Sequence, residues 1–128
     1  MGDIIAHALS QIKNAEKKGM SQCVVKPVSN LLRNIFDLMR SKGYIGDFEV
    51  VDDNKGGLIK VNLKGKINNC GAIKPRFSAK FSNFEKFEKR YLPAKGFGIL
   101  IISTTKGIMT QEKAEKEKLG GQLLAYVY

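Results

Sequence analysis

A chain of 128 residues with 43% apolar content is long enough to form one domain, or two very small ones, around a hydrophobic core. Lys and Arg number 22 against 12 Asp and Glu, which predicts a polyanion as partner, although a merely soluble basic domain would carry the same charge. No apolar run approaches the roughly 20 residues of a membrane helix, and the early Asp3 argues against a signal peptide. We therefore expect a cytoplasmic protein with no membrane partner.

Helices and strands alternate in the first half of the chain. Apolar residues at helical spacing predict a first helix that begins after a cap at Asp3 and stops by Gly19. A short strand at Cys23–Val25 follows, and Pro27 limits its extent because proline cannot donate to a sheet ladder.

Ser29 is expected to cap a second helix, which Gly43 ends. Residues 44–51 and 58–63 predict a β-hairpin, because the turn-forming residues 52–57 separate them. The first half is therefore predicted to be an α-β-α-β-β two-layer unit.

The second half is predicted to be mostly β, with short helices. Residues 65–71 are interpreted as a linker between an N-terminal α/β domain, residues 1–64, and a C-terminal RNA-binding domain, residues 72–128. Residues 72–81 predict a strand that Pro75 confines to an edge or a bulge. The aromatic residues of a predicted short helix at Phe84–Leu92 are assigned to packing in preference to base stacking.

The last elements are a buried strand at Gly98–Ile102, a short helix beginning at Thr110 and ending at Gly120, and a final strand at Leu123–Tyr128. The fold class predicted for the whole chain is α+β, with two small domains.

Residues for catalysis or metal binding are few. His7 is the single histidine, and Cys23 and Cys70 are isolated from each other and from any metal-like spacing. The paired acids Asp52 and Asp53 fall in the predicted hairpin turn, where they serve the turn. We expect no enzyme activity, no metal and no cofactor. An enzyme acting on a phosphorylated substrate is the alternative, and it lacks a base and a nucleophile partner.

The best candidate site is a loop of three hydroxyls that emerges from a buried strand. Hydroxyls can donate and accept, which suits base edges, phosphate and the ribose 2′-OH, and the next helix would offer free N–H groups near Thr110. The alternative is a turn that only caps the helix. The candidate residues are Ser103, Thr104, Thr105, Lys106 and Gly107.

Other polar and basic residues form weaker candidates for RNA contact. One group lies on the first helix and at the start of the second, where a helix N-terminus suits phosphate, although a solvated face is the alternative. A further pair of bases lies in the strand predicted over residues 72–81. These candidates are Lys13, Asn14, Lys26, Ser29 and Asn30, together with Lys74 and Arg76.

The chain resembles the universal small-subunit ribosomal protein eight family. The opening stretch Asp3–Ala15 is similar to the family's apolar helix with its basic-Asn pair, and Gly43–Ile45 to its helix exit. The most specific match runs from Gly98 to Thr110 and again from Leu119 to Val127. The stretches 70–77, 88–94 and 124–128 are similar to archaeal-type members.

This resemblance implies a two-domain α+β protein of the small ribosomal subunit. It implies primary binding to the central domain of 16S rRNA, help in assembling the subunit platform, and other small-subunit proteins as partners. It also implies that the Ser103–Thr105 loop touches RNA, with Thr105 where the family has Ser, and that Gln122 stands at a contact position where an acid is frequent. An mRNA that mimics the rRNA site would use the same surface.

Overall fold

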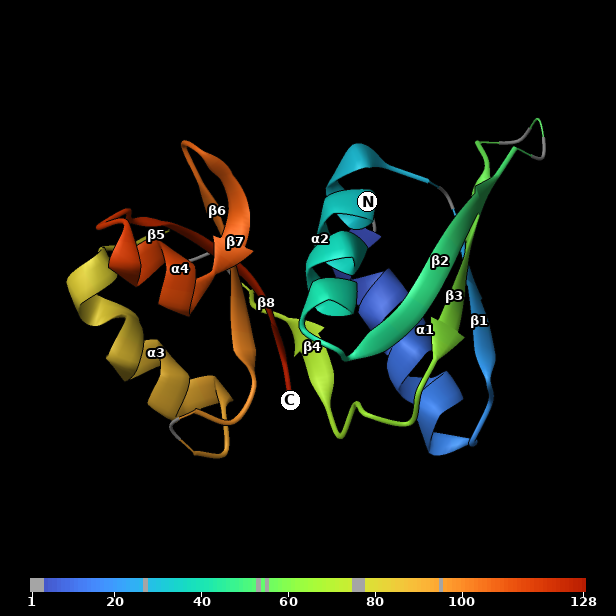
Figure 1. Cartoon of the computed structure of the whole chain (residues 1–128), viewed down its shortest axis with the longest axis horizontal. Helices are drawn as coiled ribbons and strands as arrows, with labels where there is room; N and C mark the ends of the chain where they lie inside the picture. The colour runs from blue at the N-terminus through green and yellow to red at the C-terminus, as the bar shows by residue number, and fades with distance from the viewer. Residues whose placement is uncertain (1–3, 27, 53, 55, 75–77, 95) are drawn as a thin grey trace. The chain divides into compact units, whose positions relative to one another are not determined.

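The computed structural model describes residues 4–26, 28–52, 54, 56–74, 78–94 and 96–128. The chain divides into two compact units, residues 1–69 and 70–128 (Figure 1). Each unit contains helices and antiparallel strands, which confirms the predicted α+β class. Among the described residues, no helix is long and apolar enough to span a membrane.

The first unit has the predicted α-β-α-β-β order. Its antiparallel sheet has the strand order β1-β3-β2, and both helices lie on one face of it (Figure 1). The cap expected at Asp3 lies outside the described residues. The elements are α1 (Ile4–Lys17), β1 (Gln22–Val25), α2 (Asn30–Ser41), β2 (Ile45–Val51) and β3 (Leu58–Leu63).

Local signals in the sequence set the ends of α2 and the hairpin turn. The Ser29 hydroxyl accepts a hydrogen bond from the Leu32 N–H at 3.1 Å, which confirms the predicted N-cap. Gly43 follows the helix with a φ of +83°, a conformation that glycine adopts without steric cost. In the turn after β2, the Asp52 carboxylate accepts from the Asn54 N–H at 2.9 Å, so Asp52 serves the turn.

The second unit is a five-stranded antiparallel sheet with two short helices over one face (Figure 1). Strand β8 is central: it pairs with β6 on one side and with β4 and β5 on the other. The elements are β4 (Cys70–Ala72), β5 (Ser78–Ala79), a 3₁₀ turn (Phe81–Asn83), α3 (Phe84–Tyr91), β6 (Ile99–Thr104), β7 (Gly107–Thr110), α4 (Gln111–Lys116) and β8 (Gly121–Val127).

Two details of the second unit differ from the expectation. Cys70 and Gly71, placed in the linker, are the first residues of β4. Instead of one strand over residues 72–81, the described residues form β4, which ends at Ala72, and the two-residue β5. The two strands pair with opposite ends of β8, so each can be short.

The core of the second unit lies between the sheet and the helices. Leu100, Ile102 and Leu123 from β6 and β8 pack in one cluster with Phe84 of α3, and all four are essentially buried. Phe87 and Tyr91 pack against the same cluster. The assignment of the aromatic residues of α3 to packing is therefore confirmed.

Replacing Ser29 by Ala should lower the free energy of unfolding by about 1 kcal/mol, because the Leu32 N–H loses its capping acceptor. Ser29→Asp retains an acceptor and is the matched control. Urea unfolding followed by circular dichroism measures both. Equal losses in the two variants would show that the cap contributes nothing.

Candidate nucleic-acid interface

The predicted hydroxyl loop is a tight β-hairpin. Thr104 pairs with Gly107 across β6 and β7, which leaves only Thr105 and Lys106 in the turn. The loop is shorter than the sequence predicts between the buried strand and the helix at Thr110, because Gly107–Thr110 forms β7 and pairs with the end of β6. The buried Met109 fits this strand, but four residues are too few to show the period-two pattern clearly.

The three hydroxyls have different roles. The Thr104 hydroxyl donates to the Gly107 carbonyl at 2.8 Å and accepts from the Lys106 N–H at 3.1 Å, so it closes the turn. Among the described residues, no hydrogen bond engages the side chain of Ser103 or Thr105. Ser103 is half-buried and Thr105 is exposed. The hydroxyls of Ser103 and Thr105 are therefore the two that remain for a ligand.

A row of polar side chains crosses three strands beside this hairpin. Gln122 of β8 is the register partner of Ser103 on β6 and of Ser78 on β5. Register partners in antiparallel strands present their side chains on the same face. The neighbouring residues Ala79, Ile102 and Leu123 belong to the core under the helices, so the row lies on the opposite face.

This polar row lines an open hollow of about 610 Å³. The predicted residues Ser103, Thr104, Thr105 and Gln122 meet there, although Gln122 is 17 or more residues from the others in sequence. Sequence reasoning missed three polar or basic lining residues, Ser78, Lys80 and Asn83, because the two-residue β5 gives no periodic signal.

Two glycines allow the strands around the hollow to come together. A Cβ on Gly121 would lie 2.1 Å from the Ser103 carbonyl oxygen, and a Cβ on Gly120 would lie 2.8 Å from the Ala79 carbonyl oxygen. Both distances are impossible for a real side chain without a backbone shift. Glycine is therefore required at both positions by close packing of the backbone.

The start of α4 is more internal than the sequence predicts. Thr110 and Gln111 are only 2% and 3% exposed. The Thr110 hydroxyl accepts from the Lys113 N–H at 3.4 Å, and the Gln111 side-chain oxygen accepts from the Leu100 N–H at 2.8 Å. Both side chains therefore satisfy internal donors, and the Lys113 N–H is not free for the phosphate contact predicted at this helix start.

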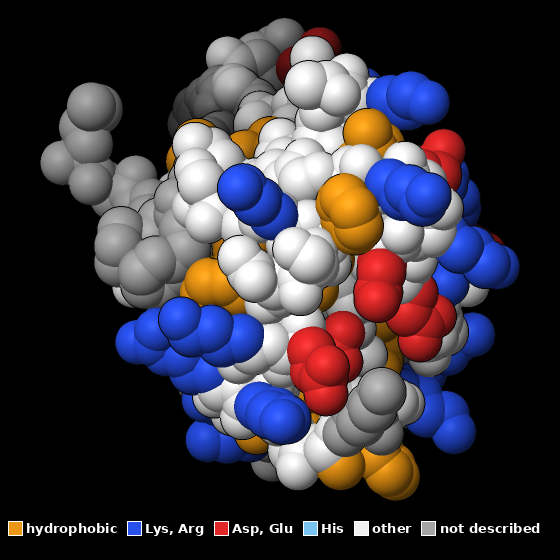
Figure 2. All heavy atoms as spheres, turned by 90° about the vertical axis from the view of Figure 1, so that its left-hand side faces the viewer, with side chains coloured by type: hydrophobic (Ala, Val, Ile, Leu, Met, Phe, Trp, Pro, Cys, Tyr) orange, Lys and Arg blue, Asp and Glu red, His pale blue; other side chains and the backbone are white. Residues whose placement is uncertain are grey.

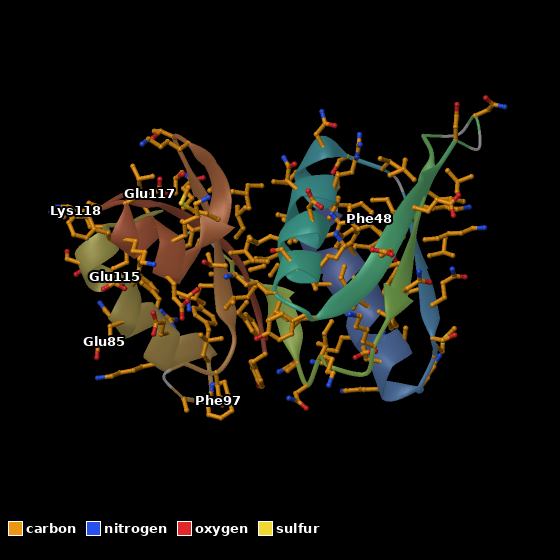
Figure 3. The ribbon with its side chains drawn as sticks, in the orientation of Figure 1. Phe48, Glu85, Phe97, Glu115, Glu117 and Lys118 are labelled. Carbon is orange, nitrogen blue, oxygen red and sulfur yellow. The ribbon has the colours of Figure 1, made fainter. Side chains whose placement is uncertain are left out.

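Charges are divided unevenly over the second unit. All five acidic residues from 70 to 128 lie on α3, on α4 or at the end of α4, and six basic residues lie among them. Figure 2 shows this side, where acidic side chains gather between basic ones. In Figure 3, Glu85, Glu115 and Glu117 lie on this helix layer.

The rest of the second unit has basic residues and no acid. They are Lys74, Arg76, Lys80, Lys95 and Lys106. Lys74, Lys80 and Lys106 are exposed, whereas Arg76 and Lys95 lie outside the described residues. Lys80 lines the hollow, and Lys106 lies at the tip of the hairpin. A polyanion therefore meets net attraction on this part and nearly balanced charge on the helix layer.

Comparison with known proteins identifies the family. The model of the family described as Ribosomal protein S8 matches residues 3–128. The chain is 53% identical over 126 residues to the Small ribosomal subunit protein uS8 of Archaeoglobus fulgidus, which covers 98% of each chain. The chain belongs to the ribosomal protein S8 family. It is thus a member of a family of structural, non-enzymatic proteins of the small ribosomal subunit, as the resemblance predicted.

In the described part of this S8-family chain, the residues that could support catalysis or bind a metal do not lie together in one site. His7 is exposed on α1, and Cys23 and Cys70 are buried thiols that form no disulfide. Burial raises the pKa of the Cys23 thiol, which makes it a poor nucleophile. Within the described part of the chain, no three His, Cys, Asp or Glu side chains are grouped so as to hold a metal ion.

The candidates in the first unit of the S8-family chain do not form one site. Lys13 is half-buried on α1, Asn14 lines a hollow between α1 and β1, and Lys26 is exposed after β1. Asn30, the first residue of α2, lines a different hollow of about 570 Å³ with Arg33, Asn34 and other residues of that helix. Ser29 uses its hydroxyl as the N-cap.

Gly121→Ala should lower the free energy of unfolding by about 2 kcal/mol, because the new methyl group overpacks the space beside the Ser103 carbonyl. Gly46→Ala is the control, since its Cβ would lie 3.3 Å from the Cβ and the carbonyl oxygen of Asn62, a tight contact that needs a shift of only a few tenths of an ångström. Urea unfolding followed by circular dichroism compares them. A loss no larger for Gly121→Ala than for Gly46→Ala would contradict the close approach.

Proposed function

We propose that the chain is a primary rRNA-binding protein that binds the central domain of 16S rRNA and helps to assemble the platform of the small subunit. Residues 72–128 supply the main contact, and residues 1–64 supply a second contact around α1 and the start of α2. The observation that carries the proposal is the polar row Ser78, Gln122 and Ser103, which lines the hollow beside the hairpin on the part of the unit that has no acid.

The chemistry of this hollow suits an unstacked nucleotide. The free hydroxyls of Ser103 and Thr105 and the amide of Gln122 can bond both to base edges and to the ribose 2′-OH. Lys80 and Lys106 lie at or near the hollow and can neutralise the adjoining phosphates. Gln122 carries no charge, so it adds no repulsion against phosphate.

Selectivity and affinity are therefore expected to come from different residues. The Lys and Arg side chains neutralise phosphates regardless of sequence, while the hydroxyl and amide groups distinguish one irregular RNA site from a uniform duplex. Footprinting of small-subunit rRNA fragments with the purified chain tests the site. Protection should be confined to one irregular helix of the central domain, and diffuse protection along many helices would refute the proposal.

Removing both free hydroxyls in the double variant Ser103→Ala, Thr105→Val should weaken binding to the cognate rRNA helix about tenfold. Each hydrogen bond to a neutral base edge or ribose hydroxyl contributes about 0.5–1.5 kcal/mol, and 1.4 kcal/mol is a factor of ten. Binding to an unrelated RNA duplex should change little. Thr105→Ser, which retains a hydroxyl, is the matched control. Filter binding or fluorescence anisotropy measures the dissociation constants, and equal loss on both RNAs would remove the hydroxyls from recognition.

Lys80→Gln and Lys106→Gln should each reduce the slope of log affinity against log salt by about one, because each removes one phosphate contact. Lys86→Gln on α3 is the matched control, since it removes the same charge from the helix layer and should leave the slope unchanged. Titrations at several salt concentrations give the slopes. If Lys86→Gln had the larger effect, the RNA would lie over the helices instead.

A further inference from the structure

Strand β1 lies at an edge of the three-stranded sheet, because it pairs with β3 and with no other described strand. The Leu63 N–H donates to the Ser21 carbonyl at 2.9 Å, which makes these two residues a hydrogen-bonded pair. Such pairs alternate along an antiparallel ladder, so Cys23 and Val25 also bond to β3. The N–H and C=O groups of Gln22 and Val24 therefore point away from the sheet.

Strand β1 itself carries no charged side chain, proline or bulge, although it is only four residues long and Lys26 and Pro27 follow it in the sequence. Edge strands are commonly blocked by a charged side chain, a proline or a bulge. The four residues of β1 are Gln22, Cys23, Val24 and Val25, and the β1–β3 register runs without a shift. Val24 is 41% exposed, and Met20 just before the strand is 50% exposed. The edge is therefore both apolar and open to a further strand.

An open hollow of about 730 Å³ lies between this strand and α1. It is lined by Gln11, Asn14, Ala15 and Lys18 of α1 and by the stretch from Met20 to Val24. Among the described lining residues, Lys18 alone is charged. An extended backbone with small or apolar side chains suits this lining better than a row of phosphates does.

The side chain of Gln11 also lines this hollow. Its amide oxygen is buried and has no hydrogen-bond partner within the described part of the chain. A buried acceptor without a donor is costly, so such a group in a native protein requires an explanation. Because the oxygen is shielded from solvent, a ligand in the hollow would reach it only if the Gln11 side chain turned toward the opening.

We propose that the free edge of β1 takes an extended segment of another small-subunit protein as an added strand, with its side chains beside α1. Backbone pairing with Gln22 and Val24 supplies the hydrogen bonds, and Met20 and Val24 supply apolar contacts. The partner is expected to be a small-subunit protein because the chain belongs to a family of small-subunit proteins. RNA at Asn14 is the rival occupant of the same hollow, and it lacks the alternating donors and acceptors of a strand. With a strand in the hollow, the RNA contact proposed for α1 is left to Lys13, which does not line the hollow.

Amide hydrogen exchange with residue resolution tests the proposal in three states: the free chain, its complex with protein-free rRNA, and the assembled small subunit. In the free chain, the Gln22 and Val24 amides should exchange quickly, and those of Cys23 and Val25 slowly. In the subunit, the exchange of Gln22 and Val24 should slow at least about tenfold. In the rRNA complex these two amides should stay fast, while the Ser103 region becomes protected.

A pair of variants ties this protection to backbone pairing. Val24→Pro removes an N–H that points away from β3, a position where an edge strand tolerates proline. The Gln22 amide should then stay fast in the subunit, whereas Val24→Thr should leave it protected. Slow exchange at Cys23 and Val25 in both variants shows that β1 still pairs with β3.

Three results would overturn the proposal. Fast exchange of Gln22 and Val24 in the subunit would leave the edge empty. Protection in the protein-free rRNA complex would assign the hollow to RNA. Protection in the free chain that increases with protein concentration would assign the edge to a second copy. Absence of protection around Ser103 in the rRNA complex would instead refute the RNA-binding role, so the two failures are distinguishable.

Discussion

The close approach of Gly121 to the backbone of Ser103 is the constraint on which the second unit depends. Strand β8 must pair with β6 on one side while β5 and β4 pair on the other, and its first residues carry the polar row. A side chain at Gly121 would push β8 away from β6 at the place where Gln122 and Ser103 are register partners. The close approach of Gly121 to Ser103 therefore determines both the stability of the sheet and the position of the hollow.

The division of charge gives the second unit two different sides. The acids on α3 and α4 balance the bases of that layer, and the core beneath separates them from the polar row. A polyanion is attracted to the acid-free part, where Lys80 and Lys106 lie, without being drawn over the helices. The net charge of +10 alone implies only that a polyanion is attracted, whereas its distribution implies an orientation.

Local signals predicted most of the fold, because they act over a few residues. The cap at Ser29, the end of α2 at Gly43 and the hairpin around Asp52 all depend on side chains or backbone angles near their own positions. The strands β5 and β7 were not predicted as they occur, since two and four residues are too few to show a period of two. Their pairing with β8 and β6 decides their conformation.

The candidate site was also only partly predictable, because local signals identify some of its residues and strand pairing brings in the others. The hydroxyls after the buried strand drew attention to Ser103–Thr105, but only the structure shows that Thr104 closes the turn and that the start of α4 is internal. The family resemblance predicts Gln122, and its place beside Ser103 depends on strand register. Ser78 and Lys80 carry no local signal, and they join the hollow through the pairing of β5 with β8.

The closed turn at Thr104 has a consequence for the kinetics of recognition. Because its hydroxyl already holds Lys106 and Gly107 in place, the hairpin loses little conformational entropy when a ligand arrives. If RNA binds here as proposed, a preformed surface of this kind would meet related RNA sites at similar association rates. Discrimination between a correct and an incorrect site would then lie in how long each complex lasts.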